Sequence, residues 1–269
     1  MTAPSKLVEV RGLQVDFFTS KGLFTAVKEV DFDIGRGEVM GLAGESGCGK
    51  STIAFALMRL HRPPAIVSRG SIRIDGTDIL ALSPRALETW RWRQTSMVFQ
   101  SAMSSLNPVL TIFEQFRDVI ARHANGNRDA ARARAEALMR MVSISPGRLD
   151  DYPHQLSGGM RQRVVLAMAL ALEPKLVIMD EPTTALDVVV QREILQEIMT
   201  LKERLGFSIL FITHDLALMA QFADRIAIML EGRLVETAAV SDIVGNPQHA
   251  YTRKLWSAMP RLQAALEAV

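Results

Sequence analysis

The stretch Gly44-Glu45-Ser46-Gly47-Cys48-Gly49-Lys50-Ser51 decides the interpretation of this 269-residue chain. It matches the pattern G-x-x-x-x-G-K-[ST], in which backbone N–H groups and a lysine ammonium surround phosphate groups. Glycines tolerate the dihedral angles of such a loop and leave room for the ligand. We therefore expect these eight residues and Thr52 to bind a nucleotide, with Lys50 on the phosphates and Ser51 on Mg²⁺. A chance match is the alternative, expected in about one chain in a hundred of this length.

The sequence around this loop predicts the strand, loop and helix of a phosphate-binding unit. An apolar run at residues 38–43 precedes the loop, and a helix is expected from Lys50 to about residue 60. Upstream, residues 8–18 and 27–34 have strand character, the second with alternating apolar and polar positions. A hairpin is expected at residues 70–80, around the turn Asp75-Gly76.

The rest of the chain first turns helical and then alternates strands with helices. The middle, residues 83–172, is rich in helix, including one at residues 129–142. The last third has buried strands at 176–179 and 208–213, an amphipathic helix at 188–205 and a hairpin at 227–236. Buried apolar strands that alternate with helices predict an α/β fold with a largely parallel sheet.

Composition excludes several classes of protein. A hydrophobic content of 48% is ample for one large domain, and a net charge of +2 gives no electrostatic reason to expect a nucleic acid partner. The single cysteine, Cys48, excludes a disulfide framework. We expect no signal peptide, and the longest apolar stretch, residues 164–172, falls short of the roughly 20 residues that cross a bilayer. Work at a membrane would therefore need separate membrane-spanning subunits.

Two acidic residues, Asp180 and Glu181, end the apolar strand at residues 176–179. A parallel strand beside the phosphate loop would bring Asp180 to the Mg²⁺ and Glu181 to a water molecule that attacks the γ-phosphate. The alternative is a helix cap, since Asp and Glu often follow strands. The phosphate loop in the same chain favours the catalytic interpretation.

Two further polar residues end predicted strands. His214 follows the buried strand at 208–213, on the side of the sheet where open α/β folds bind ligands, and is a candidate sensor of the γ-phosphate. Gln100 follows the apolar residues 97–99 and is a candidate ligand of the metal and the water. The alternative for His214 is a purely structural role. The alternative for Gln100 is no functional role at all.

A second possible anion site is Leu156-Ser157-Gly158-Gly159-Met160-Arg161-Gln162, which precedes a helix expected to reach about residue 172. A serine and two glycines at a helix N-terminus bind anions without a lysine. One nucleotide needs one phosphate cradle. The second cradle therefore suggests that two chains share each nucleotide.

The five motifs together resemble the ATP-binding-cassette family, in particular the ATPase subunits of peptide/nickel importers. Residues 156–160 look like the signature motif and 180–187 like the Walker B end with the D-loop, which ends at Asp187. Residues 98–100 resemble the Q-loop and 212–215 the switch-histidine region. The order and spacing match from about residue 7 to 260.

The resemblance implies a fold and a domain organisation. The expected fold is an α/β P-loop NTPase cassette, with a RecA-like core, an antiparallel β subdomain and an α-helical signature subdomain. We expect one nucleotide-binding domain at residues 1–260, with the helical part inserted at about 101–172, and a short tail at 261–269.

The resemblance also implies a mechanism. Cassettes work in head-to-tail pairs, so residues 44–52 of one subunit and the signature residues of the other would enclose ATP and Mg²⁺. The signature residues that would act across the pair are Ser157, Gly158, Gly159 and Gln162. The pair would consist of identical or paralogous chains, and residues 101–108 would contact two membrane permease subunits, a solvated loop being the alternative. Phe24 is the candidate for stacking on adenine, with Phe17 and Phe18 as competitors.

The narrower resemblance to peptide/nickel importers rests on residues 104–108, 152–156 and 249–252. Two departures stand against it: Gln100 is followed by Ser101-Ala102-Met103 where Asp-Pro-Met is usual, and His249 is followed by Ala250 where proline is usual. Relatives often have a C-terminal extension with cysteines that holds an iron–sulfur cluster. With Cys48 alone, we expect no cluster here.

Three classes of protein contain a phosphate loop of this kind. The first is a transport ATPase on the cytoplasmic face of the bacterial inner membrane, which works as an importer with an extracytoplasmic solute-binding protein. The second is a soluble cassette that acts on DNA or ribosomes, which would need long coiled coils, a zinc module or a second cassette. The third is a GTPase or kinase, but no Asn-Lys-x-Asp motif is present. The first is preferred, with dipeptides, oligopeptides, nickel chelates, opines and some sugars open as substrates.

Overall fold

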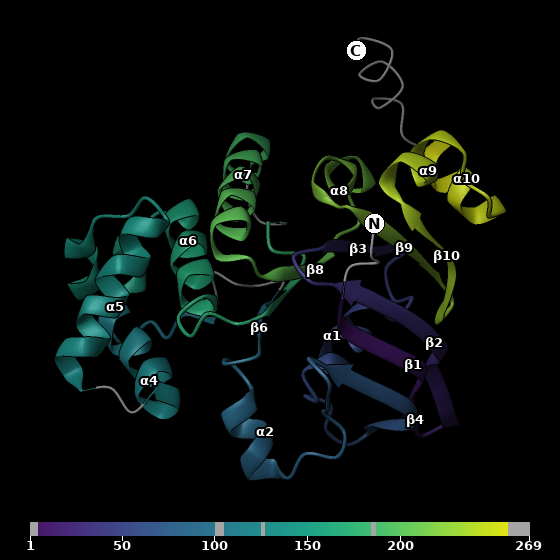
Figure 1. Ribbon diagram of the computed structural model, residues 1–269, viewed down its shortest axis with the longest axis horizontal. Coiled ribbons are helices and arrows are strands. Elements are labelled where there is room, and N and C mark those ends of the chain that lie inside the picture. Colours follow the sequence, from purple (N-terminus) through teal and green to yellow (C-terminus); the bar gives the residue numbers. More distant parts are fainter. Residues whose placement is uncertain (1–4, 100–104, 125–126, 184–186, 258–269) are drawn as a thin grey trace. The chain divides into compact units, whose positions relative to one another are not determined.

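The computed structural model of the chain describes residues 5–99, 105–124, 127–183 and 187–257. It contains two compact units (Figure 1). Unit 1 combines the two ends of the chain, Met1–Ala81 and Ile209–Val269, and unit 2 is the middle, Leu82–Ser208.

An antiparallel sheet with the strand order β2-β1-β4-β5 forms the first part of unit 1. The first two strands form a hairpin, in which Val15 pairs with Val27 and Phe17 with Phe24. Apolar side chains of β1 alternate into the core, as the sequence pattern predicts, and both strands extend beyond the predicted ranges. The strands are β1 (Lys6–Thr19), β2 (Gly22–Gly35), β4 (Ala65–Ile74) and β5 (Thr77–Asp78).

The second part of unit 1 is built around β3 (Val39–Gly44), which pairs in parallel with β8 and β9 on either side. Strand β10 pairs antiparallel with β9 and completes the predicted hairpin. The strands are β8 (Ser208–Ile212), β9 (Arg225–Leu230) and β10 (Arg233–Ala239). The helices are α1 (Lys50–Leu57), α8 (Leu216–Phe222), α9 (Val240–Gly245) and α10 (Ala250–Ser257).

Unit 2 contains a parallel strand pair, β6 (Thr95–Val98) and β7 (Leu176–Asp180), and most of the helices. Four of its helices begin at a residue whose side chain accepts a hydrogen bond from a backbone N–H of the first turn, and these caps are Ser83, Asn127, Ser157 and Asp187. The helices are α2 (Pro84–Trp90), α4 (Ile112–Ala124), α5 (Arg128–Met141), α6 (Gly158–Ala169), α7 (Val188–Leu205) and the 3₁₀ helices η1 (Pro146–Asp150) and η2 (Pro153–Gln155).

The predicted helical insertion at residues 101–172 falls within unit 2 and stays a prediction. The compact unit is larger, because β6, β7 and α7 group with the helices of the middle. The predicted tail at 261–269 lies outside the described residues. Within the described ranges, no helix has the length and the apolar character needed to cross a membrane.

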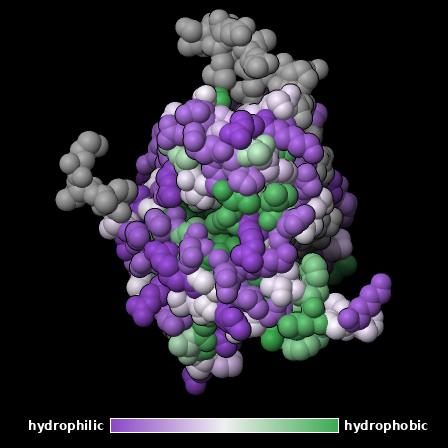
Figure 2. Space-filling view, turned by 90° about the vertical axis from the view of Figure 1, so that its right-hand side faces the viewer, coloured by the Kyte–Doolittle hydropathy of each residue, from purple (hydrophilic) through white to green (hydrophobic). Residues whose placement is uncertain are grey.

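Exposed apolar side chains gather on the hairpin of β1 and β2. Phe18, Leu23 and Phe24 are each more than half exposed. Figure 2, which views the right-hand side of Figure 1, shows hydrophobic patches on a mostly hydrophilic face. Aromatic side chains on that hairpin are therefore accessible to a ligand.

Candidate functional site

The phosphate loop joins the buried strand β3 to the N-terminus of α1 in unit 1, as the sequence predicts. Gly49 caps the helix with φ at 110°, in a region that side chains rarely adopt. A Cβ atom at Gly49 would lie 2.8 Å from the carbonyl oxygen of Ala26. Glycine is therefore needed here both for the backbone conformation and for the close approach of β2.

Lys50 is held against the loop that precedes it. Only 7% of the residue is exposed, and Nζ donates hydrogen bonds to the carbonyl oxygens of Gly44 and Glu45, each at 2.8 Å. Nζ also lies 3.7 Å from Sγ of Cys48, whose pKa is raised by burial. The ammonium group is thus placed at the loop by contacts within unit 1, and the first turn of α1 adds its N–H groups.

Two residues that the sequence analysis did not assign contact this loop. The N–H of Glu45 donates to the hydroxyl oxygen of Tyr251, at 3.2 Å, and burial raises the pKa of that tyrosine. Nε2 of His61 lies 2.9 Å from the carbonyl oxygen of Thr52, and burial lowers the pKa of His61. Tyr251 belongs to residues 249–252, which contribute to the resemblance to peptide/nickel importers. That resemblance marks the stretch but predicts no role for the tyrosine.

The candidate aromatic residues differ in accessibility. Phe24 and Phe18 are 58% and 59% exposed, whereas Phe17 is partly buried and packs edge-on against His61 with the ring centroids 6.4 Å apart. Phe24 lies two residues before Ala26, the residue whose carbonyl oxygen closely approaches Gly49. The structure therefore favours Phe24 and Phe18 over Phe17 as stacking candidates, with Phe24 on the strand segment that approaches the loop.

His214 lies near the edge of the unit 1 sheet at which β3 leads into the phosphate loop. It follows β8, which runs parallel to β3, so both strands end at the same edge. His214 is exposed, and the following residue, Asp215, caps α8 by accepting from the N–H of Leu218 at 2.9 Å. The predicted position at the ligand-binding edge is consistent with this geometry.

Asp180 and Glu181 occupy the end of β7 in unit 2. Asp180 is 5% exposed, and Glu181 is partly exposed with φ at 48°. The neighbouring parallel strand β6 ends at the same edge, just before Phe99. Gln100, the predicted metal and water ligand, lies outside the described residues.

The signature residues form the N-terminus of α6. Oγ of Ser157 accepts from the N–H of Met160 at 3.2 Å, which caps the helix. A Cβ atom at Gly159 would lie 3.2 Å from Cγ1 of Val190, so glycine allows α7 to pack closely. Asp187, the D-loop residue, caps α7 by accepting from the N–H of Val190 at 3.0 Å.

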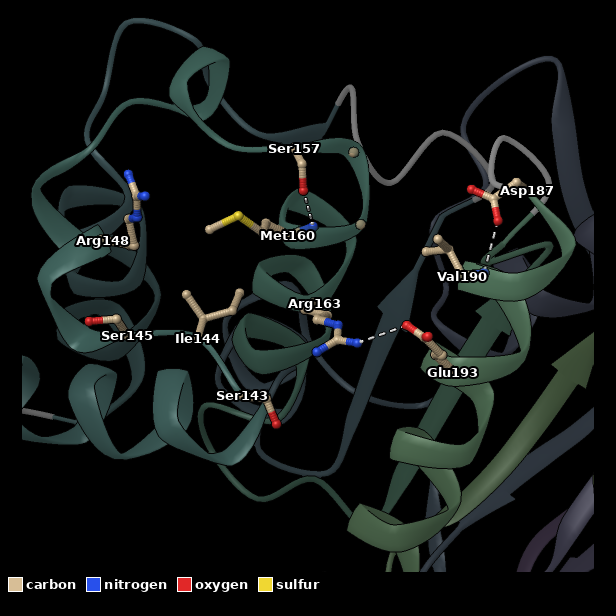
Figure 3. A pocket seen from close by; sticks show the side chains of 12 residues that line it. Ser143, Ile144, Ser145, Arg148, Ser157, Met160, Arg163, Asp187, Val190 and Glu193 are labelled. Atoms are coloured by element: carbon tan, nitrogen blue, oxygen red, sulfur yellow. Dashed lines mark hydrogen bonds and ion pairs between the residues drawn. The ribbon is translucent and has the colours of Figure 1, made fainter.

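An open cavity of about 600 Å³ lies at this end of α6 (Figure 3). Signature residues line one part of it and the start of α7 lines another. Arg163 lies between the two helices, with ion pairs to Glu193 at 3.7 Å and Glu197 at 3.3 Å. Burial raises the pKa of Glu197. Besides Arg163 and Glu193, the residues that line the cavity are Ser143, Ile144, Ser145, Arg148, Ser157, Gly158, Gly159, Met160, Asp187 and Val190.

The side chain of Gln162 does not point toward the cradle, as a role across a pair of chains would require. Its side chain is 3% exposed, and Nε2 donates a hydrogen bond to the carbonyl oxygen of Pro182 in the same chain. At about 100° per residue, position 162 is rotated by roughly 140° around the helix from Ser157. Its amide therefore faces the interior of unit 2 rather than the cradle.

The fold and the loop define a P-loop nucleotide-binding protein. The sequence profile of the family "ABC transporter" matches residues 27–184, more than half of the chain. The chain belongs to the ABC transporter family.

Curated relatives include the oligopeptide transport ATP-binding protein of Bacillus subtilis (strain 168), 42% identical over 99% of this chain and 75% of that protein. The dipeptide transport ATP-binding protein of the same organism is 43% identical over 96% of this chain and 78% of that protein. A solved dimeric ATP-binding cassette bound to ADP and phosphate superposes with a TM-score of 0.76 at 28% identity, covering 87% of this chain and 98% of that one. The predicted fold class and the assignment as the ATPase of a transporter are confirmed.

Proposed function

We propose that the chain is the ATP-hydrolysing subunit of a peptide importer, attached to membrane permease subunits on the cytoplasmic face of the bacterial inner membrane. The names of the relatives, oligopeptide and dipeptide transport ATP-binding proteins, support peptides as the transported class. An extracytoplasmic solute-binding protein would deliver the substrate. ATP hydrolysis by this chain would supply the energy for transport.

We assign the phosphate chemistry to residues at the ends of buried strands. Lys50 and the N–H groups of residues 44–52 bind the β- and γ-phosphates, as the hydrogen-bonded position of the ammonium supports. Glu181 polarises the attacking water, and His214 contacts the γ-phosphate. Oxygen donors from Ser51, Asp180 and Gln100 suit Mg²⁺, which would neutralise charge on the phosphates when bound.

The observation that carries the proposal is the capped, glycine-rich N-terminus of α6, far in sequence from the phosphate loop. It places the backbone N–H groups of a first helical turn beside an open cavity whose lining includes no lysine. We assign Ser157, Gly158 and Gly159 to the γ-phosphate of a nucleotide held by a second cassette, with Asp187 beside that junction. The dimeric form of the solved relative supports such a pair. A second copy is the simplest partner, and a paralogue is the alternative.

Two contacts complete the proposal. Phe24 stacks on the adenine, supported by its 58% exposure on a strand that reaches the loop. Residues 101–108 contact the permease subunits, although residues 101–104 lie outside the described part of the chain. Val109, which is 75% exposed directly after this segment, provides apolar surface for such a contact.

The test compares Glu181→Gln with Glu203→Gln, a control at an exposed position of α7. The chain is reconstituted with its permease subunits and solute-binding protein in proteoliposomes, and ATP turnover and uptake of labelled dipeptides and oligopeptides are measured. We expect Glu181→Gln to bind ATP normally and to lose turnover by about 1,000-fold or more, because the general base is lost. The control should match the wild type.

Near-normal hydrolysis by Glu181→Gln would rule out Glu181 as the base. Uptake of a nickel chelate with no uptake of peptides would rule out the proposed substrate class. Absence of ATP turnover in the wild-type complex would contradict the proposal as a whole.

A further inference from the structure

The backbone at the candidate base has an uncommon conformation. Glu181 has φ at 48°, in the left-handed region, which a residue other than glycine adopts at an energetic cost. Such a conformation persists where the surrounding structure holds it. The residues that follow, Pro182 and Thr183, are buried, and Thr183 is only 4% exposed. The contacts of this segment therefore determine how Glu181 is presented.

The signature helix provides one of these contacts. Gln162, in the second turn of α6, donates from Nε2 to the carbonyl oxygen of Pro182. Both residues are buried, so loss of the donor would leave a carbonyl group without this partner in a place that water does not readily reach. The hydrogen bond thus links the helix that begins with Ser157 to the residue directly after Glu181.

Helix α6 also contacts α7, the helix that follows this segment. Gly159 packs against Val190, and Arg163 forms ion pairs with Glu193 and Glu197 on α7. The connection from β7 to α7 therefore meets α6 near both of its ends. A movement of α6 would reach the backbone on both sides of this connection.

We propose that Gln162 is a positioning residue, which holds Pro182 and thereby the backbone of Glu181 through the signature helix of its own chain. This inference rests on the proposed function. In a pair of cassettes, the signature of one chain meets the nucleotide of the other, whereas Glu181 serves the nucleotide of its own chain. Gln162 would therefore connect the occupancy of one ATP site to the geometry of the base in the other.

The experiment replaces the donor without changing the size of the side chain. Gln162→Met removes the amide and keeps a similar length. Gln196→Met makes the same chemical change at an exposed position of α7 and is the control. Steady-state ATP turnover of the full chain with Mg²⁺ is measured for both. We expect kcat of Gln162→Met to fall on the order of tenfold with KM changed by less than about twofold, since ground-state binding is untouched.

A second measurement separates positioning from contact with a nucleotide. In a Glu181→Gln background, ATP-driven pairing is followed by size-exclusion chromatography. We expect Gln162→Met to pair as the parent does. A raised KM together with lost pairing would show that Gln162 contacts ATP across the pair, and an unchanged kcat would show that it does not position the base. Either result would overturn the inference.

A third measurement does not depend on turnover. Hydrogen exchange of backbone amides is compared in nucleotide-free protein, in peptides that cover residues 176–183. We expect faster exchange in Gln162→Met and no change in Gln196→Met. Equal exchange in both would overturn the inference, whereas a wild-type chain without ATPase activity would contradict only the proposed function. If Gln162→Met does not fold, Gln162→Asn, which keeps the amide but shortens its reach, is measured in the same way with the same expected results.

Discussion

The phosphate loop of unit 1 and the signature helix of unit 2 both place polar groups at a helix N-terminus, and we propose each as an anion site, but they are built differently. The loop at α1 is capped by Gly49 without a side-chain hydrogen bond and holds a buried lysine. The start of α6 is capped by the side chain of Ser157 and borders an open cavity. Lys50 supplies the loop with a full positive charge, whereas the α6 cradle relies on N–H groups and the helix dipole.

This difference indicates that the two sites contribute to different steps, the binding of ATP and its turnover. A loop with a positioned ammonium can bind phosphates within one chain. A cradle with no lysine binds weakly by itself and contributes once a nucleotide is brought to it. Affinity for ATP should therefore reside in the loop, and the rate of turnover should also depend on the α6 cradle.

The largest expected effect on affinity comes from Lys50→Ala. Loss of charged hydrogen bonds to phosphate costs about 1.5–3 kcal/mol, which lowers the affinity for ATP by about 10- to 100-fold. Isothermal titration calorimetry on the full chain measures this, with Lys202→Ala on α7 as the control. Affinity within about twofold of the wild type would contradict the role of the lysine.

A smaller effect is expected from Ser157→Ala, compared with Ser83→Ala. Both serines cap a helix by accepting from the backbone N–H three residues on, so both variants should lose about 1 kcal/mol of stability in thermal unfolding. Only Ser157→Ala should also lower ATP turnover, by roughly tenfold, because it loses one hydrogen bond to a charged phosphate, and the affinity of the single chain should be unchanged. Equal turnover in the two variants would remove the distinction between the α6 cradle and an ordinary helix cap.

Much of this organisation follows from the sequence, because it depends on local patterns. The glycine loop, the apolar strand that ends in Asp180, the apolar strand that precedes His214 and the serine cap at α6 are each encoded within a few neighbouring residues. The alternation of buried apolar strands with helices then predicts a largely parallel sheet, but not the order or register of its strands.

Other features depend on contacts between distant residues and escaped the sequence analysis. The hydrogen bond from Glu45 to Tyr251 joins residues 206 positions apart. Gln162 was assigned to the signature because it follows the glycines, but the helical rotation turns it toward Pro182. Unit 2 extends beyond residues 101–172 because β7 and α7 pack with the helices of the middle. No local sequence motif predicts such packing.

In the proposed pair, the α6 cradle of one chain completes the ATP site of the other. The most direct test mixes equal amounts of Lys50→Ala and Ser157→Ala chains and measures ATP turnover at an ATP concentration near the wild-type KM, at which sites that lack Lys50 are mostly empty. In a pair of copies, each mixed pair contains one site with an intact loop and an intact signature, so turnover should recover to roughly a quarter of the wild-type rate, well above the mean of the two variants alone. Turnover equal to that mean would contradict a site shared between two copies of this chain.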